Sequence, residues 1–151
     1  MPVVPHWVWG VAITLTCGFA AWKGRAPERW GALCFYGAWV LTIAVYDPNG
    51  VATQWAIFGV DSVLLALLVA LALRSDRYWP LFMAAFQLLT VLTHVGRILD
   101  DDLPWWAYHT APQIWGYLMI LALLVGTLNT WRERRQVAAI APMADPGATR
   151  R

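Results

Sequence analysis

The stretch QLLTVLTHVGRILDDDLPWWAYHTAPQ, which occupies residues 87–113, decides how this chain is organised. It leaves one apolar run, crosses three consecutive aspartates and Pro104, and enters another apolar run. This order predicts the outer end of one membrane helix, a tight acidic turn and the start of the next helix. The stretch also holds two of the three histidines and Arg97, the only arginine outside a basic cluster. It therefore predicts where a polar site would lie.

The composition of the whole chain is typical of a polytopic membrane protein. Of its 151 residues, 60% are hydrophobic and 13% are charged, whereas soluble domains are about 45–50% apolar and about 25% charged. The net charge of +2 does not indicate nucleic-acid binding, because the basic residues form short clusters between apolar runs. Cys17 and Cys34 lie inside apolar runs without a CxxC pattern, so we expect buried thiols.

The apolar runs predict an all-α membrane bundle of five transmembrane helices, since a span needs about 20 residues. The predicted spans cover roughly 5–22, 30–47, 52–73, 78–99 and 104–131. Residues 23–29, which are charged and contain Pro27, are predicted to form the first loop. Residues 1–136 would form one domain, and residues 137–151 would form a disordered cytoplasmic tail.

The basic residues predict the orientation of the bundle. Ten of the eleven Lys and Arg residues fall on one side of a five-span chain, and they are Lys23, Arg25, Arg29, Arg74, Arg77, Arg132, Arg134, Arg135, Arg150 and Arg151. The opposite side has Asp47, Asp100, Asp101 and Asp102 against Arg97 alone. Because basic loops stay in the cytoplasm, we expect the N-terminus outside and the C-terminus inside, in the inner (cytoplasmic) membrane. Four spans would break this asymmetry.

The tryptophans fit the same arrangement. Nine of the eleven lie at predicted helix ends, among them Trp9 on the outer side and Trp79 on the inner side. Indole rings favour the headgroup level of a bilayer. We therefore expect these nine to form two interfacial belts, with only Trp39 and Trp115 deeper in the membrane.

Polar residues recur at helical spacing on three of the predicted spans. On the fourth span, Gln87, Thr90, His94 and Arg97 follow at intervals of three, four and three residues, which places them on one stripe of a helix. The pairs on the other two spans are Gln54 and Asp61 on the third, and His109 and Gln113 on the fifth. We expect these faces to meet inside the bundle, because polar groups that face lipid are costly.

The predicted site is a polar pocket that is open to the outer face and narrows to Asp61. Its members are Gln54, Asp61, Gln87, Thr90, His94, His109 and Gln113. Its outer rim consists of Arg97, Asp100, Asp101 and Asp102, among which we expect an exposed ion pair. Intramembrane ionisable residues are functional candidates by default, although Asp61 could also serve only to hold helices together through Gln87.

Depth along the helices separates the members of this pocket. Asp61 and Gln87 lie near the middle of their spans. His94 follows Gln87 by seven residues, so a rise of about 1.5 Å per residue puts it about 10 Å further out, at nearly the level of His109. We therefore expect no basic side chain at the depth of Asp61.

Three functions fit this pattern, and none is enzymatic, because the sequence has no nucleophile–base pair, phosphate loop or zinc-spacing motif. The first, which small size and composition favour, is an accessory or structural subunit that self-associates or packs against other membrane subunits. The second is transport of a small solute or of protons through the pocket centred on Asp61. The third is binding of haem b or a divalent metal by His94 and His109.

Overall fold

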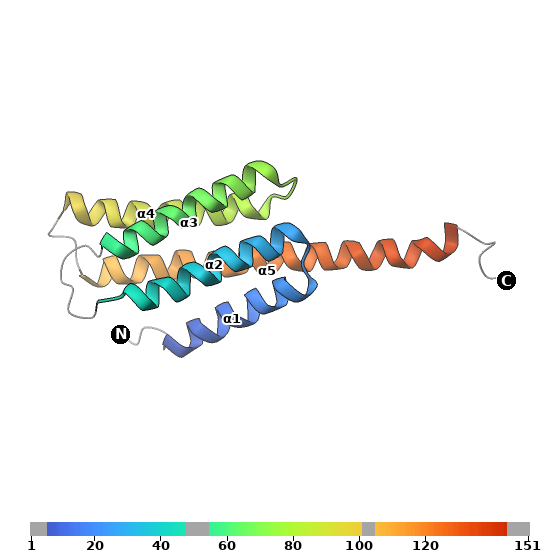
Figure 1. The fold of residues 1–151 in the computed structure, drawn as a ribbon, viewed down its shortest axis with the longest axis horizontal. Coiled ribbons are helices and arrows are strands. Elements are labelled where there is room, and N and C mark those ends of the chain that lie inside the picture. The colour runs from blue at the N-terminus through green and yellow to red at the C-terminus, as the bar shows by residue number, and fades with distance from the viewer. Residues whose placement is uncertain (1–5, 48–54, 101–104, 145–151) are drawn as a thin grey trace.

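Five α-helices account for the part of the chain that the structure describes (Figure 1). The structure is a computed structural model, and it describes residues 6–47, 55–100 and 105–144, with side chains at 7–47, 55–100 and 110–139. The helices are α1 (His6–Lys23), α2 (Ala26–Val45), α3 (Trp55–Arg74), α4 (Trp79–Leu99) and α5 (Trp105–Ala144). The predicted all-helical bundle is thus confirmed.

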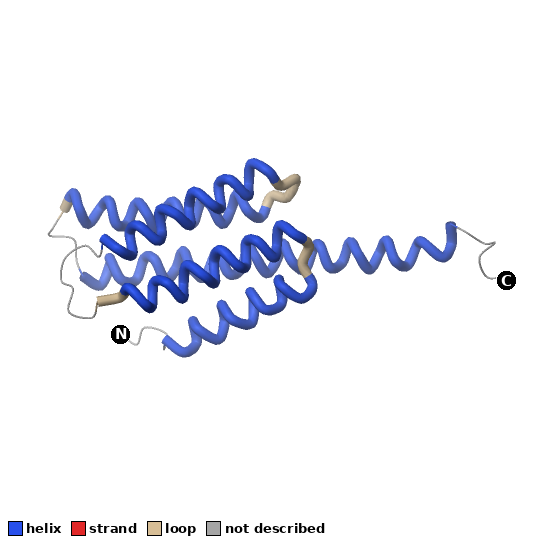
Figure 2. The backbone as a smooth tube through the Cα atoms, in the orientation of Figure 1, coloured by secondary structure: helices blue, strands red, loops and turns tan. Residues whose placement is uncertain are grey.

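The helices pack in an order that brings the first helix and the last helix together. Each of α1 to α4 packs against the helix that follows it, and α5 also returns to contact α1 and α2 (Figure 1). Short connections join α1 to α2 and α3 to α4 (Figure 2). With 18 to 21 residues, α1 to α4 are about 27–32 Å long at 1.5 Å per residue, close to the roughly 30 Å hydrocarbon thickness of a bilayer.

The first connection is shorter than the sequence suggested, because α2 already begins at Ala26. Pro27 lies in the first helical turn, where its missing N–H costs nothing and its fixed φ suits the helix. The carboxylate of Glu28 accepts a hydrogen bond from the backbone N–H of Arg25 at 2.8 Å, which satisfies a donor at the helix start. The predicted loop at 23–29 was therefore too long by several residues.

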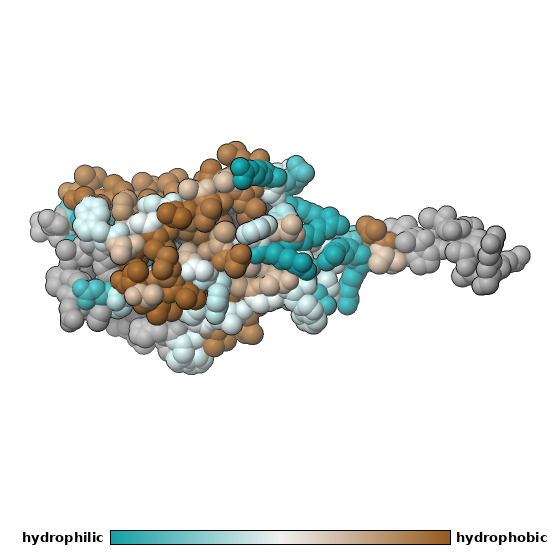
Figure 3. Space-filling model, viewed as in Figure 1, coloured by the Kyte–Doolittle hydropathy of each residue, from teal (hydrophilic) through white to brown (hydrophobic). Residues whose placement is uncertain are grey.

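The two ends of the bundle carry opposite charge, and Figure 3 shows hydrophilic atoms gathered at one of them. At the basic end α1 and α3 finish, α2 and α4 begin, and α5 passes by; its cations are Lys23, Arg25, Arg29, Arg74, Arg77, Arg132, Arg134 and Arg135. Two contacts tie α5 to this end: an ion pair of 2.7 Å between Arg77 and Glu133, and a bond of 3.5 Å from Arg134 to the Lys23 carbonyl. The pairing with Glu133 raises the pKa of Arg77. The opposite end, called the acidic end below, has Asp47 and Asp100 among its described residues.

Within the part of the chain that the structure describes, three helices are long and apolar enough to cross a membrane, namely α3, α4 and the part of α5 from Thr110 to Ala139. Large apolar side chains lie exposed on the bundle surface, and Figure 3 shows them as a broad hydrophobic band. Such a band suits lipid far better than water. These observations indicate a membrane protein, while five spans and their orientation stay predictions.

Tryptophans and glycines decide how closely the helices approach each other. Trp79 is only 6% exposed, and its ring lies directly against Gly31 of α2 and Gly126 of α5, where a Cβ would come within 2.5 Å of it. Trp9 of α1 lies in the same way against Gly116 of α5. Glycines on facing helices thus make room for both rings between the helices, while the two interfacial tryptophan belts stay a prediction.

The last helix is longer than the sequence suggested. It continues to Ala144, so the first eight residues of the predicted disordered tail, 137–144, are helical. These residues include several alanines, which have the highest helix propensity. They also extend an existing helix, so the cost of forming a first helical turn does not arise again. Figure 1 shows this part of α5 projecting beyond the bundle at the basic end.

Candidate functional site

The centre of the candidate site is a hydrogen-bonded cluster of Asp61, Gln87 and His94. The Gln87 amide donates to the Asp61 side chain at 2.9 Å and to the Asp61 backbone carbonyl at 3.1 Å. The Nε2 atom of His94 lies 3.0 Å from the other carboxyl oxygen of Asp61. Gln87 and His94 are buried, whereas the side chain of Asp61 keeps 16% exposure. The cluster joins α3 to α4, because Asp61 of α3 contacts two residues of α4 that are seven positions apart.

The contact between His94 and Asp61 corrects the expectation that no basic side chain reaches the depth of Asp61. Along α4, His94 does lie seven residues beyond Gln87. However, helical side chains lean toward the N-terminus of their own helix. Since α3 and α4 run in opposite directions, Asp61 and His94 lean toward each other, and the long Gln87 side chain spans the remaining distance.

The hydrogen-bond partners define where a proton can sit in this cluster. A backbone carbonyl can only accept, so the Gln87 atom facing it is the amide nitrogen, and the Asp61 oxygen bonded to the same nitrogen is an acceptor too. The 3.0 Å contact between the other oxygen and His94 then requires one proton between the two atoms. The imidazole can take up a second proton, so the pair can alternate between a net charge of −1 and 0.

This cluster lies on the wall of a partly open cavity of about 680 Å³ to which all five helices contribute. Its polar lining includes five of the residues assigned to the predicted pocket, namely Asp61, Gln87, Thr90, His94 and Gln113. Its remaining lining is mostly aromatic or apolar, and Pro112 of α5 forms part of it. A volume of this size is typical of sites for small organic molecules, which occupy about 300–1,000 Å³.

The cavity lies in the half of the bundle nearer the acidic end. Trp7 at the start of α1 and Tyr46 just after α2 line it and are more than half exposed, so they stand at its mouth. Beyond its inner wall, toward the basic end, Leu68 and Leu123 are fully buried and Trp79 nearly so. Among the described residues, exposed side chains of the cavity wall thus lie toward the acidic end, and packed side chains lie toward the basic end.

Several predicted members of the site fall elsewhere. Arg97 and Asp100 lie at the acidic end but do not line the cavity. Gln54, Asp101 and Asp102 lie outside the described residues, as does the side chain of His109. Whether the rim forms an ion pair stays a prediction.

A second buried carboxylate, Glu28, escaped the sequence analysis. It is 1% exposed and accepts hydrogen bonds from Trp79 Nε1 at 3.2 Å, from Thr130 Oγ1 at 2.9 Å and from the Arg25 backbone N–H at 2.8 Å. These bonds join α2, α4 and α5 at the basic end. The Pro-Glu pair at a helix start was the available signal, but it predicts only a local cap, because the donors on α4 and α5 are 51 and 102 residues away.

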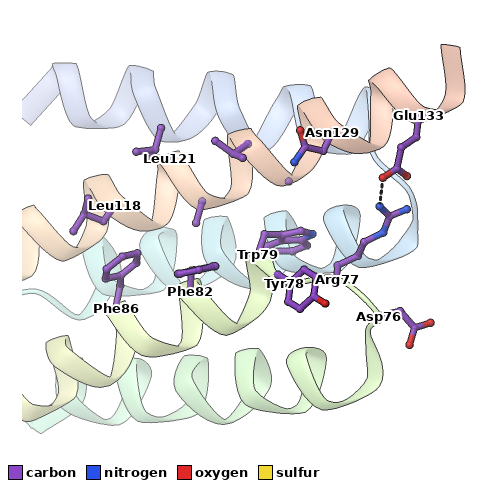
Figure 4. Close-up of a pocket in the computed structure, with 13 residues that line it drawn as sticks. Asp76, Arg77, Tyr78, Trp79, Phe82, Phe86, Leu118, Leu121, Asn129 and Glu133 are labelled. Carbon is purple, nitrogen blue, oxygen red and sulfur yellow. Dashed lines mark hydrogen bonds and ion pairs between the residues drawn. The ribbon is translucent and has the colours of Figure 1, made fainter. Parts of the chain in front are cut away.

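A groove of about 540 Å³ runs between α4 and α5 on the outer surface at the basic end (Figure 4). Its apolar floor includes Trp79, Phe82 and Phe86, and the ion pair between Arg77 and Glu133 closes one end, as Figure 4 shows. The groove faces the exterior of the bundle and holds no catalytic constellation among its lining residues.

Metal and haem binding find limited support in the geometry. Among the side chains that the structure describes, at 7–47, 55–100 and 110–139, no cluster of three His, Cys, Asp or Glu residues could hold a metal ion. The Nε2 atom of His94 already faces Asp61, so axial ligation of haem through that atom would have to break this contact.

Comparison with known proteins gives no guide to the function of this chain. The chain matches no family model, no curated protein and no solved structure.

Proposed function

We propose that this protein is a proton-coupled carrier of a small solute, with the cavity as its binding site and the Asp61–His94 pair as its proton-binding group. One observation supports this most directly: a titratable pair that needs a shared proton lies on the wall of a 680 Å³ cavity inside the bundle. A purely structural hydrogen bond between helices would be expected to be enclosed by packing, yet Asp61 retains exposure.

The coupling follows from electrostatics. With one proton the pair carries a net charge of −1, and with two it is neutral. In a cavity with a low-dielectric wall, this difference changes the affinity for any solute that bears charge or donates hydrogen bonds to Asp61. The binding of solute and the binding of a proton then influence each other. If the cavity opened alternately to the two ends of the bundle, solute and protons would cross the membrane in a coupled way.

The membrane arrangement that accompanies this function has five spans, an outer N-terminus and a cytoplasmic C-terminus in the inner membrane. The basic end supports it, because eight described cations cluster there and basic residues remain cytoplasmic. The lengths of α1 and α2 support it as well. With 18 and 20 residues, both helices are close to the roughly 20 residues that a membrane span needs. The cavity would then open outward.

The accessory function favoured by composition stays a prediction. The exposed apolar side chains of α3 and α4 suit contact with lipid as well as contact with a partner subunit. Asp61 does hold α3 and α4 together through Gln87, but that role leaves its contact with His94 and its exposure to the cavity unexplained.

Difference infrared spectroscopy of the protein in lipid tests the proton-binding group. We expect a carboxyl band that changes between about pH 4 and about pH 9, the range in which carboxyl and imidazole groups titrate. Asp61→Asn should remove this band, and His94→Gln should shift its midpoint. Asp76→Asn, which removes an exposed carboxylate at the basic end, is the matched control and should keep the band.

The proposal fails if the Asp61→Asn spectrum retains every carboxyl change seen in the wild type. It also fails if His94→Gln leaves the midpoint of the Asp61 band unchanged, because the two groups would then titrate independently.

A further inference from the structure

The charges on the cavity wall indicate the sign of the solute. Among the described residues that line the cavity, Asp61 is the one carboxylate, His94 is the one imidazole, and there is no lysine or arginine. With a single shared proton the Asp61–His94 pair has a net charge of −1, so an empty cavity has an uncompensated negative group on its wall. Burial of a further anion there would be costly, and a cation would be stabilised.

Aromatic rings make up much of the remaining wall. They are Trp7, Trp9, Phe35, Trp39, Tyr46 and Tyr117. Trp9 is held edge-on against Tyr117 and Phe35, with ring centroids 5.0 and 6.5 Å apart, so these rings form a packed group. Aromatic faces attract organic cations through their quadrupole, most strongly for substituted ammonium groups in desolvated sites.

Asp61 retains the capacity to bind such a ligand. A carboxylate has about four lone-pair positions, and the side-chain oxygens of Asp61 contact Gln87 and His94. Its side chain keeps 16% exposure and lies on the cavity wall. The same two neighbours hold it in place, so it is oriented before the ligand arrives.

We infer that the solute is an organic cation of the substituted-ammonium class, bound with its charge near Asp61 and its apolar part against the aromatic rings. This assignment deepens the proposed function and rests on it. A volume of 680 Å³ leaves room for an apolar body larger than the ammonium group itself.

Protons should compete with this cation. The described titratable side chains on the cavity wall are Asp61 of α3, His94 of α4, Tyr117 of α5 and Tyr46 at the end of α2. Of these, the Asp61–His94 pair is the proposed proton-binding group. A second proton on the pair removes its net negative charge, so the affinity for the cation falls as the pH falls. No covalent step is involved: one proton enters the pair as the cation leaves.

Choline and its uncharged isostere 3,3-dimethylbutan-1-ol are suitable probes, because a carbon replaces the charged nitrogen while the shape is kept. We expect isothermal titration calorimetry of the protein in lipid nanodiscs to show choline binding at least about tenfold more tightly than the alcohol. Asp61→Asn should abolish this preference, and Trp39→Leu should weaken choline binding about two- to fivefold. Asp76→Asn should leave both affinities unchanged.

The outcomes separate this assignment from the proposed function. Equal affinity for the two probes, or no binding of either, overturns the cation assignment if the infrared band of Asp61 still titrates, and the proton-coupled site then takes another class of solute. If that band does not titrate, the proposed function fails first and the assignment fails with it. Thermal melts of each variant show that it is folded, so a lost preference is assigned to the side chain.

Discussion

Glu28 shows how one buried residue can fix the packing of three helices. Both of its carboxylate oxygens accept hydrogen bonds, and two of the three donors, the Trp79 indole and the Arg25 backbone, can only donate. An ionised carboxylate satisfies all three, and its burial is tolerated for that reason. The same residue would be costly to bury without these partners.

Replacement of this carboxylate is expected to destabilise the bundle. In Glu28→Gln an amide NH₂ would replace one acceptor and face a donor, so the free energy of unfolding should fall by about 1.5–3 kcal/mol, the contribution of hydrogen bonds to a charged group. Thermal melts in detergent measure this loss. Glu133→Gln, which removes an ion pair at a half-exposed carboxylate, is the control and should cost about 0–1 kcal/mol. Equal losses would show that burial of Glu28 does not matter.

Asp61 is expected to tolerate loss of its charge better than loss of its hydrogen bonds. Asp61→Asn keeps an acceptor for Gln87 and places an amide donor against His94, so we expect a change in unfolding free energy below about 1 kcal/mol. Asp61→Leu leaves both buried partners unsatisfied and should cost about 2–5 kcal/mol. Denaturation in detergent compares the two variants. If Asp61→Asn destabilises as strongly as Asp61→Leu, the charge itself holds the helices together.

At the scale of helices, the close contact between α4 and α5 depends on a glycine facing a ring. A Cβ at Gly126 would lie 2.4 Å from the Trp79 ring, a distance that forces the ring or the helix to move. A Cβ at Gly59 of α3 meets no atom within 4 Å. Both glycines lie within helices, but only Gly126 faces a side chain that a Cβ would meet.

This difference gives a matched pair of variants. Gly126→Ala should destabilise the protein by about 1–3 kcal/mol, the usual cost of overpacking, and should weaken the bond from Trp79 to Glu28. Gly59→Ala should be neutral or stabilise by up to about 1 kcal/mol, because alanine restricts the unfolded chain and suits a helix. Melting temperatures and tryptophan fluorescence report both effects. Destabilisation by Gly59→Ala and not by Gly126→Ala would contradict the packing described above.

For the whole molecule, the charge difference between the two ends leads to a topology prediction. A reporter that is active only outside the cytoplasm should be active when fused after Asp101 and silent when fused after Arg135, since basic segments remain cytoplasmic. A fusion after Pro48, between α2 and α3, should also be active. The reverse pattern, or equal activity at all sites, would exclude five spans with an outer N-terminus.

Much of the fold was predictable because it depends on local pattern. Long apolar runs and polar stripes at helical spacing lie within single helices, and the residues that reveal them are within about two turns of each other. For the same reason Asp61, Gln87, Thr90, His94 and Gln113 could be assigned to interior faces before their contacts were known. Helix ends were less predictable: α2 starts early because of Pro27, and α5 runs on to Ala144.

By itself, the sequence determined an all-helical, lipid-compatible bundle with one basic end and a polar interior, because hydropathy and spacing are properties of each segment alone. Only the tertiary structure decided which side chains meet. The contact of Asp61 with His94 spans 33 residues, and the bonds of Glu28 to Trp79 and Thr130 span 51 and 102. Such contacts depend on how each helix is rotated and how far it slides against its neighbours. Those two quantities are set by close packing, here of Trp79 and Trp9 against facing glycines, and no single segment encodes them.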